Sequence, residues 1–387
     1  DAYGNVYLAG STGSSTGISS NGFQNSIGGS TDAFLVKFDW AGTRQWATYY
    51  GGSAADEGYS VATDNNGNVF LGGFTYSTSG IASGGFQNTH GGGSIDAFLV
   101  KFDSAGIRIW ATYYGGPGDE MVLFAGDIGV ATDSGNNVYL AGLTNSTTGI
   151  AANGYQNTIG GNYDAFLVKF ESSGGRLWAT YYGGTADDKA YQVATRPGND
   201  VLICGRTGSN TNIAAGGFYN NYGGNNDAFL VKFNTNGLRQ CGTYYGGSGI
   251  DDCNSIAVDA YGNVYLAGGT ENTASIASGG FQNSYGGGSF DAMLVKFTAG
   301  CMTTGNTELD SIALSVYPNP SDGLLTIEQQ TIGFVSVEVY NQFGQLLLVT
   351  SFTDRRRKID LSGWGNGIYF LRIIKNGEVI TQHVIIN

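Results

Sequence analysis

The chain has 387 residues, including 65 Gly and 4 Pro, and its 18 Lys and Arg against 31 Asp and Glu give a formal net charge of −13. This charge excludes the basic surface that nucleic-acid binding requires, and the absence of a Gly-X-Y period excludes collagen. The sequence contains no apolar run of about 18 residues, so no membrane span is predicted. With 24 Tyr and 21 Phe between glycine turns, the composition is typical of a β-protein.

One phrase recurs through the first three quarters of the chain. DAFLVKF begins at Asp32, Asp96, Asp164 and Asp227, and the variant DAMLVKF begins at Asp291. The interval is about 64 residues, and a fixed period filled with strand-like segments indicates a radially repeated β-architecture. A residue that occurs in every repeat belongs more often to the scaffold than to a catalytic centre.

Each repeat contains four strand-like segments, which in the third repeat are 137–142, 165–170, 177–182 and 191–195. Four antiparallel strands make one propeller blade. Counting units that end in DAFLVKF gives four full blades over about 43–297 and an N-terminal half blade. We therefore expect an all-β propeller of four-stranded blades, four full plus a half, that is incomplete at its N-terminal edge.

The first residues repeat a later segment. Residues 1–10, DAYGNVYLAG, recur unchanged at 259–268, where a strand-like segment at 255–258 precedes them. The first copy lacks that preceding segment. We therefore expect that Asp1 lies in the middle of a repeat and that a signal peptide lies upstream of it.

A Ser-, Thr- and Gly-rich loop of about 20 residues precedes each DAFLVKF segment. Every copy keeps an Ile and, further on, an aromatic residue, so we expect the loop to fold against its blade. The aromatic residues could stack on sugars or could anchor their loops, and anchoring is the favoured interpretation. These loop aromatics are Phe23, Phe86, Tyr155, Phe218 and Phe281.

Acidic pairs follow the Gly-Gly of each full repeat. Carboxylates with backbone carbonyls could hold Ca²⁺, although the spacing is not that of an EF-hand loop. The favoured alternative is hydrogen bonding in turns and pairing between blades, with the repeated lysines as partners, and then no cofactor is expected. The Ca²⁺ candidates are Asp56, Glu57, Asp119, Glu120, Asp187, Asp188, Asp251 and Asp252.

The residues of common catalytic centres are scarce. The two histidines, His90 and His383, fall in different predicted domains, so a His-based triad or a His-rich metal site is not expected. Every acidic pair is a repeat element, so no singular pair is placed for glycan hydrolysis. Among the four cysteines, Cys241 and Cys253 could form a disulfide or remain two buried thiols, and the thiols are favoured.

The repeats resemble the bacterial SBBP β-propeller repeat family. The features that match are the DAYGNVYLAG strand at 259–268, the DAFLVKF strand and the TYYGG strand end, and together they cover about 1–297. The family is similar to seven-bladed propellers and occurs in large secreted or surface proteins. The resemblance implies no shared catalytic residue.

The composition changes after residue 297, and we expect a linker at 298–310 and a separate module at 311–387. Alternating apolar residues predict a small Ig-like β-sandwich of about seven strands. The module resembles the C-terminal sorting domain of the type IX (Por) secretion system of Bacteroidota. The residues that carry this resemblance as a sorting signal are Pro318, Asn319, Pro320, Gly323, Gly344, Gly367, Tyr369 and Leu371.

Together these features predict a secreted or cell-surface, non-enzymatic propeller with an adhesion, scaffold or binding role. The resemblance implies that the type IX machinery is the partner of the C-terminal module. Two alternatives are a lectin-like module of a surface polysaccharide-handling system and an accessory propeller of a hydrolase whose catalytic domain lies upstream. A surface glycan or a protein is the expected ligand, and its identity does not follow from the loops.

Overall fold

The structure, a computed structural model, describes residues 1–120, 128–273, 276–278, 280–297, 314–329, 332–375 and 378–386. The chain divides into two compact units, 1–304 and 305–387. The boundary expected within 298–310 lies outside the described residues. Every regular element of the described part is a β-strand, which confirms the all-β class. Accordingly, this part contains no helix that could cross a membrane.

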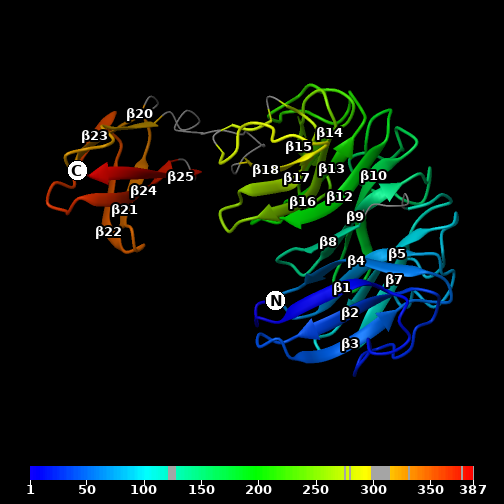
Figure 1. The fold of residues 1–387 in the computed structure, drawn as a ribbon. Coiled ribbons are helices and arrows are strands. Elements are labelled where there is room, and N and C mark those ends of the chain that lie inside the picture. The colour runs from blue at the N-terminus through cyan, green and yellow to red at the C-terminus, as the bar shows by residue number, and fades with distance from the viewer. Residues whose placement is uncertain are drawn as a thin grey trace. The chain divides into compact units, whose positions relative to one another are not determined.

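The first unit consists of five antiparallel sheets that follow one another in chain order (Figure 1). The first sheet contains β1 (Val6–Thr12), β2 (Asp32–Phe38) and β3 (Arg44–Tyr50). Three four-stranded sheets follow. The second sheet contains β4 (Asp56–Thr63), β5 (Val69–Thr75), β6 (Asp96–Phe102) and β7 (Arg108–Tyr114), and the third contains β8 (Gly129–Thr132), β9 (Val138–Thr144), β10 (Asp164–Phe170) and β11 (Arg176–Tyr182). The fourth contains β12 (Asp188–Thr195), β13 (Val201–Thr207), β14 (Asp227–Phe233) and β15 (Arg239–Tyr245). The last sheet contains β16 (Asp251–Val258), β17 (Val264–Thr270) and β18 (Asp291–Phe297).

The blade boundary differs by one strand from the expected one. A tight turn joins β2 to β3, because Asp39 N donates to Thr43 O at 3.0 Å and Gly42 N donates to Asp39 O at 2.9 Å. β3 therefore pairs with β2, and the chain crosses to the next sheet only after it. The described part holds three four-stranded sheets and two three-stranded ones, so the count of four full blades and a half is wrong. The first sheet is incomplete, as expected, but it has three strands.

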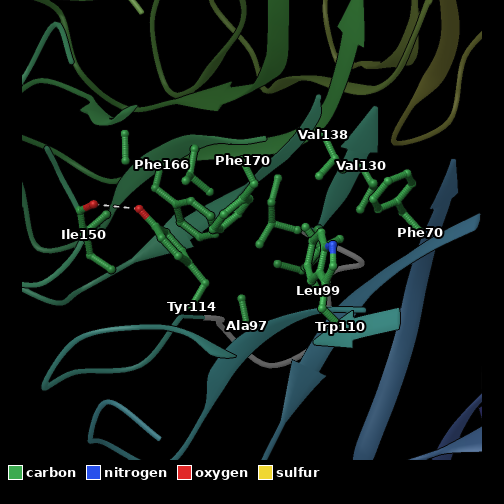
Figure 2. Close-up of a cluster of buried hydrophobic side chains, with 14 of the residues drawn as sticks. Phe70, Ala97, Leu99, Trp110, Tyr114, Val130, Val138, Ile150, Phe166 and Phe170 are labelled. Carbon is green, nitrogen blue, oxygen red and sulfur yellow. Dashed lines mark hydrogen bonds between the residues drawn. The ribbon is translucent and has the colours of Figure 1, made fainter. Parts of the chain in front are cut away.

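Neighbouring sheets pack face to face around clusters of buried side chains. Figure 2 shows the cluster between the second and third sheets. The Tyr114 ring lies 5.3 and 5.7 Å from the rings of Phe166 and Phe170, measured between centroids. Its hydroxyl donates to the Ile150 carbonyl at 2.6 Å, which ties the long loop of the next repeat to this core. The expectation that the loops fold against the blades is thereby confirmed.

A tryptophan seam joins consecutive sheets. Trp46 Nε1 donates to Ser104 O at 3.0 Å, and Trp178 Nε1 donates to Thr235 O at 2.9 Å. Each bond leads from the outer strand of one sheet to the hairpin turn of the next. Cys241 stands at the equivalent position of β15, so the fourth sheet lacks this indole donor.

The cysteines are not paired as considered from the sequence. Cys241 is disulfide-bonded, whereas Cys204 and Cys253 are buried free thiols. A bridge between Cys241 and Cys253 is therefore wrong. The favoured expectation of two buried thiols is confirmed for Cys253 and wrong for Cys241. Cys301 lies outside the described residues.

The second unit is a sandwich of seven strands in two sheets, as the sequence predicts. Its core is a single cluster of buried aliphatic and aromatic side chains. One sheet has the order β19 (Leu314–Tyr317), β20 (Leu324–Gln329), β23 (Arg356–Asp360), and the other has the order β22 (Leu346–Phe352), β21 (Val335–Asn341), β24 (Gly367–Lys375), β25 (Glu378–Ile386).

Candidate functional site

The consecutive acidic residues after each Gly-Gly point in different directions. Asp56 is completely buried at the start of β4, whereas Glu57 is partly exposed. The other three pairs are split in the same way, with Glu120, Asp188 and Asp251 as the buried members. Two neighbours in the chain therefore do not act as one chelating pair. Among the described residues, no three His, Cys, Asp or Glu side chains converge as metal ligands would, and bound Ca²⁺ stays a prediction.

Each buried acid instead meets the first residue of the preceding DAFLVKF strand. At the third interface the two carboxyl groups, of Asp164 and Asp188, converge over Gly183. A Cβ on Gly183 would lie 2.5 Å from Asp164 Cγ and 2.7 Å from Asp188 Oδ2, so only glycine fits. The other interfacial carboxyl pairs are Asp32–Asp56 over Gly51, Asp96–Glu120 over Gly115 and Asp227–Asp251 over Gly246.

The sequence reasoning missed the first member of every interfacial carboxyl pair. The available signal was an Asp that opens an otherwise apolar strand in all five copies of the phrase. Asp32 and Asp164 are completely buried, and Asp227 is 1% exposed. A carboxylate at such a position needs a local set of donors, which the adjacent Gly-Gly turn supplies.

Two of the interfacial carboxyl pairs are fully hydrogen-bonded. In the third pair, Asp164 accepts Gln156 Nε2 at 3.0 Å and the amides of Gly160 and Gly161 at 2.8 and 3.0 Å. Asp188 accepts the hydroxyls of Thr207 and Ser209 and the amide of Gly184. The first pair repeats this arrangement around Asp32 and Asp56. These contacts agree with hydrogen bonding in turns, which is the favoured alternative to Ca²⁺ binding.

Burial raises the pKa of at least one carboxyl group in every pair. The pKa of Asp188 rises to about 6 through burial, and the nearby Asp164 carboxylate raises it further, although Thr207 and Gly184 lower it. The pKa of Asp227 rises to about 6, also mainly through burial, with a contribution from Asp251. The members with a raised pKa are therefore more easily protonated than a carboxyl group in water. They are Asp56, Asp96, Glu120, Asp164, Asp188 and Asp227.

The repeated lysines pair with other acids than those after Gly-Gly. Lys169 Nζ lies 3.1 Å from Asp133 Oδ2, and Lys101 Nζ lies 3.7 Å from Asp64 Oδ2. Both aspartates belong to the turn between the first two strands of their own sheet. Lys101 Nζ also donates to Ser172 O in the turn of the next sheet at 3.0 Å, as Lys37 Nζ does to Ser104 O. The lysines thus engage other groups than the interfacial carboxyl pairs.

The loop aromatics are engaged at the blade interfaces. The Arg108 guanidinium lies 4.4 Å from the Phe23 ring centroid, and Arg176 lies 4.3 Å from that of Phe86. Arg239 covers Tyr155 in the same way at 4.6 Å. These contacts favour the interpretation that the aromatic residues anchor their loops. Phe281 differs, because it is fully exposed.

The residues of the predicted sorting signal hold the sandwich together. Asn319 Nδ2 donates to His383 O at 2.9 Å, and Asn319 Oδ1 accepts the Ile385 amide at 3.0 Å. This amide therefore joins the segment after β19 to the last strand. Leu371 is completely buried, and Tyr369 is 9% exposed and donates to Gly365 O.

The glycines of the predicted signal form two turns. Gly323 has φ +102°, and a Cβ there would lie 2.5 Å from Ser362 Cα. Gly344 has φ +77° in the turn between β21 and β22, where Asn341 Oδ1 accepts the following amides. Pro318 and Pro320 are exposed on either side of Asn319. Their recognition by an export machinery stays a prediction.

Two family models match the chain. The model described as a secretion system C-terminal sorting domain matches residues 315–387. The model described as a β-propeller repeat, SBBP, matches residues 45–80 and 242–273.

Two curated proteins share partial similarity with the chain. An uncharacterized WD repeat-containing protein, L264, of Acanthamoeba polyphaga mimivirus is 27% identical over 215 residues, which are 47% of this chain and 15% of that protein. The regulatory protein FlaEY of Caulobacter vibrioides is 25% identical over 255 residues, 62% of this chain and 26% of that protein. The chain thus spans 15% and 26% of the length of these relatives.

Solved structures give a distant likeness. PorZ, a surface component of the type IX secretion system of Porphyromonas gingivalis, is 15% identical with a TM-score of 0.28, over 99% of this chain and 58% of that one. The extracellular domain of the hybrid two-component system BT3049 of B. thetaiotaomicron is 10% identical with a TM-score of 0.26, over 92% and 48%. At these scores neither likeness carries a functional argument.

The family matches fall on the two units that the structure separates, and each agrees with the fold of its unit. The sorting domain indicates a product that is secreted or held at the outer-membrane surface. The chain therefore carries SBBP-type β-propeller repeats in its first unit and a secretion system C-terminal sorting domain in its second.

Proposed function

We propose that the protein is a non-enzymatic surface propeller that the sorting domain exports and that acts outside the cell as a binding or scaffold module. The observation that carries the proposal is the sorting domain itself, because it directs the chain to the outside. The repeated polar residues make contacts within the scaffold, which supports the proposal that the propeller is non-enzymatic. The interfacial acids face one another in the interior, and the lysines pair with aspartates of their own sheets.

Binding to a protein outside the cell is the favoured role, and a lectin-like role is the second candidate. The arginine contacts at three loop aromatics reduce the surface that is free for sugar stacking. Phe281 alone favours the lectin-like role, because its ring is fully exposed on a loop that Asn283 caps through the Gly280 carbonyl at 3.0 Å. Aromatic faces of this kind stack on sugars.

A glycan array with the purified chain separates the two roles. We expect no glycan to bind in a manner that depends on Phe281. The array would be repeated with Phe281→Ala and, as the matched control, with Phe23→Ala, whose ring packs beneath Arg108. Glycan binding that Phe281→Ala removes would establish the lectin-like role and overturn the favoured one. Turnover of any bound glycan would overturn the non-enzymatic assignment.

A further inference from the structure

Two of the four interfacial carboxyl pairs lack part of their hydrogen bonding. Oδ1 of Asp96, in the second pair, has no hydrogen-bond partner, and the same holds for Oδ1 of both Asp227 and Asp251 in the fourth pair. These residues are at most 1% exposed, so bulk water does not supply the missing donors. Buried polar atoms without partners are rare in proteins and call for an explanation.

The missing donors have a cause in the loop sequences. In the first and third loops, a Gln eight residues before the Asp donates to it, as Gln156 does to Asp164. The second loop contains one extra glycine, so Gln87 is nine residues before Asp96. Its Nε2 keeps the bond to the carbonyl two residues on, at Thr89, which the other two glutamines also make, but it does not donate to the Asp. In the fourth loop Tyr219 replaces the Gln, and no amide is available at that position.

The opposite side of the fourth pair has changed as well. In the first and third pairs a Thr and a Ser hydroxyl donate to the second acid, as Thr207 and Ser209 do to Asp188. At the fourth interface Asn272 stands at the Ser position and donates to Asp251 Oδ2 at 2.6 Å. Asn272 thus reproduces the Ser bond to Oδ2. The Oδ1 atom, which accepts the Thr hydroxyl in the other two pairs, has no donor in Asp251.

The two carboxyl groups of the fourth pair approach the same point. A Cβ on Gly246 would lie 2.6 Å from Asp251 Oδ2 and 2.8 Å from Asp227 Oδ1. Two ionised carboxylates this close, buried and short of donors, repel one another, and one bound proton would remove a charge and supply a donor. We propose that Asp227–Asp251 and Asp96–Glu120 each take up one proton in mildly acidic solution, and that these two blade interfaces weaken when the proton leaves.

The groups around the fourth pair do not offset its charge. Asp252, next in β16, forms an ion pair with Arg206 at 3.4 Å, which occupies that cation. Glu271 adds a further negative charge near Asp252. The other titratable groups that face this pair are the phenols of Tyr222, Tyr244 and Tyr245.

The groups around the second pair include a histidine. His90 Nε2 lies 3.7 Å from Asp96 Oδ1 and also lacks a hydrogen-bond partner. Burial lowers the pKa of His90, so the imidazole is neutral at pH 7. Asp119 is the remaining acid near Asp96, and Tyr181 is a phenol that faces Glu120. Burial raises the pKa of both Asp96 and Glu120, in keeping with a retained proton.

The direction of the pH effect follows from linkage. The folded pKa of Asp96, Glu120 and Asp227 lies above the unfolded value of about 4. The folded state then binds more protons than the unfolded state, so stability falls as pH rises from about 4 through the folded pKa. The propeller is therefore expected to be more stable at pH 5 than at pH 8.

The test compares Asp227→Asn with Asp164→Asn in the full 387-residue chain. An Asn at 227 needs no proton and carries an amide donor where the two side chains converge over Gly246. We expect Asp227→Asn to raise Tm at pH 8 by about 2–4 °C and to reduce the difference between pH 5 and pH 8. Asp164→Asn replaces a fully bonded carboxylate, so it should lower Tm at both pH values.

Infrared spectroscopy gives a readout that a merely structural effect would not move. At pH 5 the parent should show the C=O band of a protonated carboxyl group, and this band should weaken in Asp227→Asn and stay in Asp164→Asn. Equal pH profiles of the parent and Asp227→Asn would overturn the proposal. A Tm at pH 8 that Ca²⁺ raises in the parent but not in Asp227→Asn would also overturn it, because the pair would then bind a cation in place of a proton.

Discussion

The propeller and the sorting domain build their β-cores in opposite ways. In the propeller, each hydrophobic cluster lies between sheets that are consecutive in the chain, and the same contacts recur at each interface. In the sorting domain, distant segments meet: Asn319 binds the last strand, and β21 pairs with β24. One unit repeats its contacts, and the other makes each contact once.

The difference teaches where a single substitution acts strongly. The fourth sheet has Cys241 where other sheets have Trp, and β15 still pairs with β14 in the same register. A contact that recurs can therefore vary at one copy. The sorting domain has no second copy of Leu371 or Asn319, so we expect abrupt losses there and graded losses in the propeller.

The largest effect is expected for Leu371→Asp in the sorting domain. This side chain is completely buried, and an unpaired charge in its place should cost about 4 kcal/mol or more, enough to unfold a small domain. Hydrogen exchange should show protection lost in 314–386 and kept in 1–297. Phe370→Asp is the matched control, because Phe370 is 39% exposed on the other face of the same strand. Equal protection in the two variants would contradict the comparison.

The second-largest effect is expected for Gly183→Ala in the propeller. The added Cβ would meet the third carboxyl pair at 2.5–2.7 Å, and overpacking of this kind costs about 1–3 kcal/mol. Chemical denaturation of the chain should show a lower midpoint for the propeller transition. Gly269→Ala is the control, since its nearest contact would be Phe290 Cδ1 at 3.4 Å. A loss as large for Gly269→Ala would argue against a special role of the carboxyl pair.

The third-largest effect is expected for Asn319→Ala in the sorting domain. The substitution removes a donor to His383 O and an acceptor for the Ile385 amide, and we expect a loss of about 1–2 kcal/mol. Exchange of the Ile385 amide should become faster, while β21 keeps its protection. Asn319→Asp retains the acceptor and should lie between the parent and Asn319→Ala.

The smallest effect is expected for Trp178→Phe. Phe keeps most of the packing but removes the indole bond to Thr235 O, which should cost about 1 kcal/mol. The fall in the propeller midpoint should exceed that of Trp40→Phe, whose side chain is 82% exposed. If the two variants were equally stable, the tryptophan seam would contribute nothing measurable.

The sequence predicted the fold better than it predicted the acidic contacts. The period and the alternation of apolar residues gave the all-β class, because strands of one type recur with the same turn residues. They did not show which strand ends a blade, since DAFLVKF and RQWATYY are equally strand-like. The short turn at Asp39–Thr43, closed by its own hydrogen bonds, decides that β3 belongs to the first sheet.

The sequence predicted only part of the candidate site, because the two members of each carboxyl pair are far apart in the chain. Asp32 and Asp56 were both visible, but their meeting over Gly51 depends on the stacking of two sheets. The weaker donor sets of the second and fourth pairs depend on one extra glycine and on Tyr219. These differences are readable in the sequence once the geometry shows that the Gln amide reaches the Asp.

Export of a chain that lacks residues 311–387 tests the central claim most directly. The full chain and the truncated chain would be expressed in a host with a type IX system and followed by cell fractionation and by protease treatment of intact cells. We predict that the full chain reaches the surface or the medium, while the truncated chain accumulates in the periplasm with its propeller folded. Secretion of the truncated chain as efficiently as the full chain would contradict the sorting assignment, and residues 311–387 would then be an ordinary binding domain.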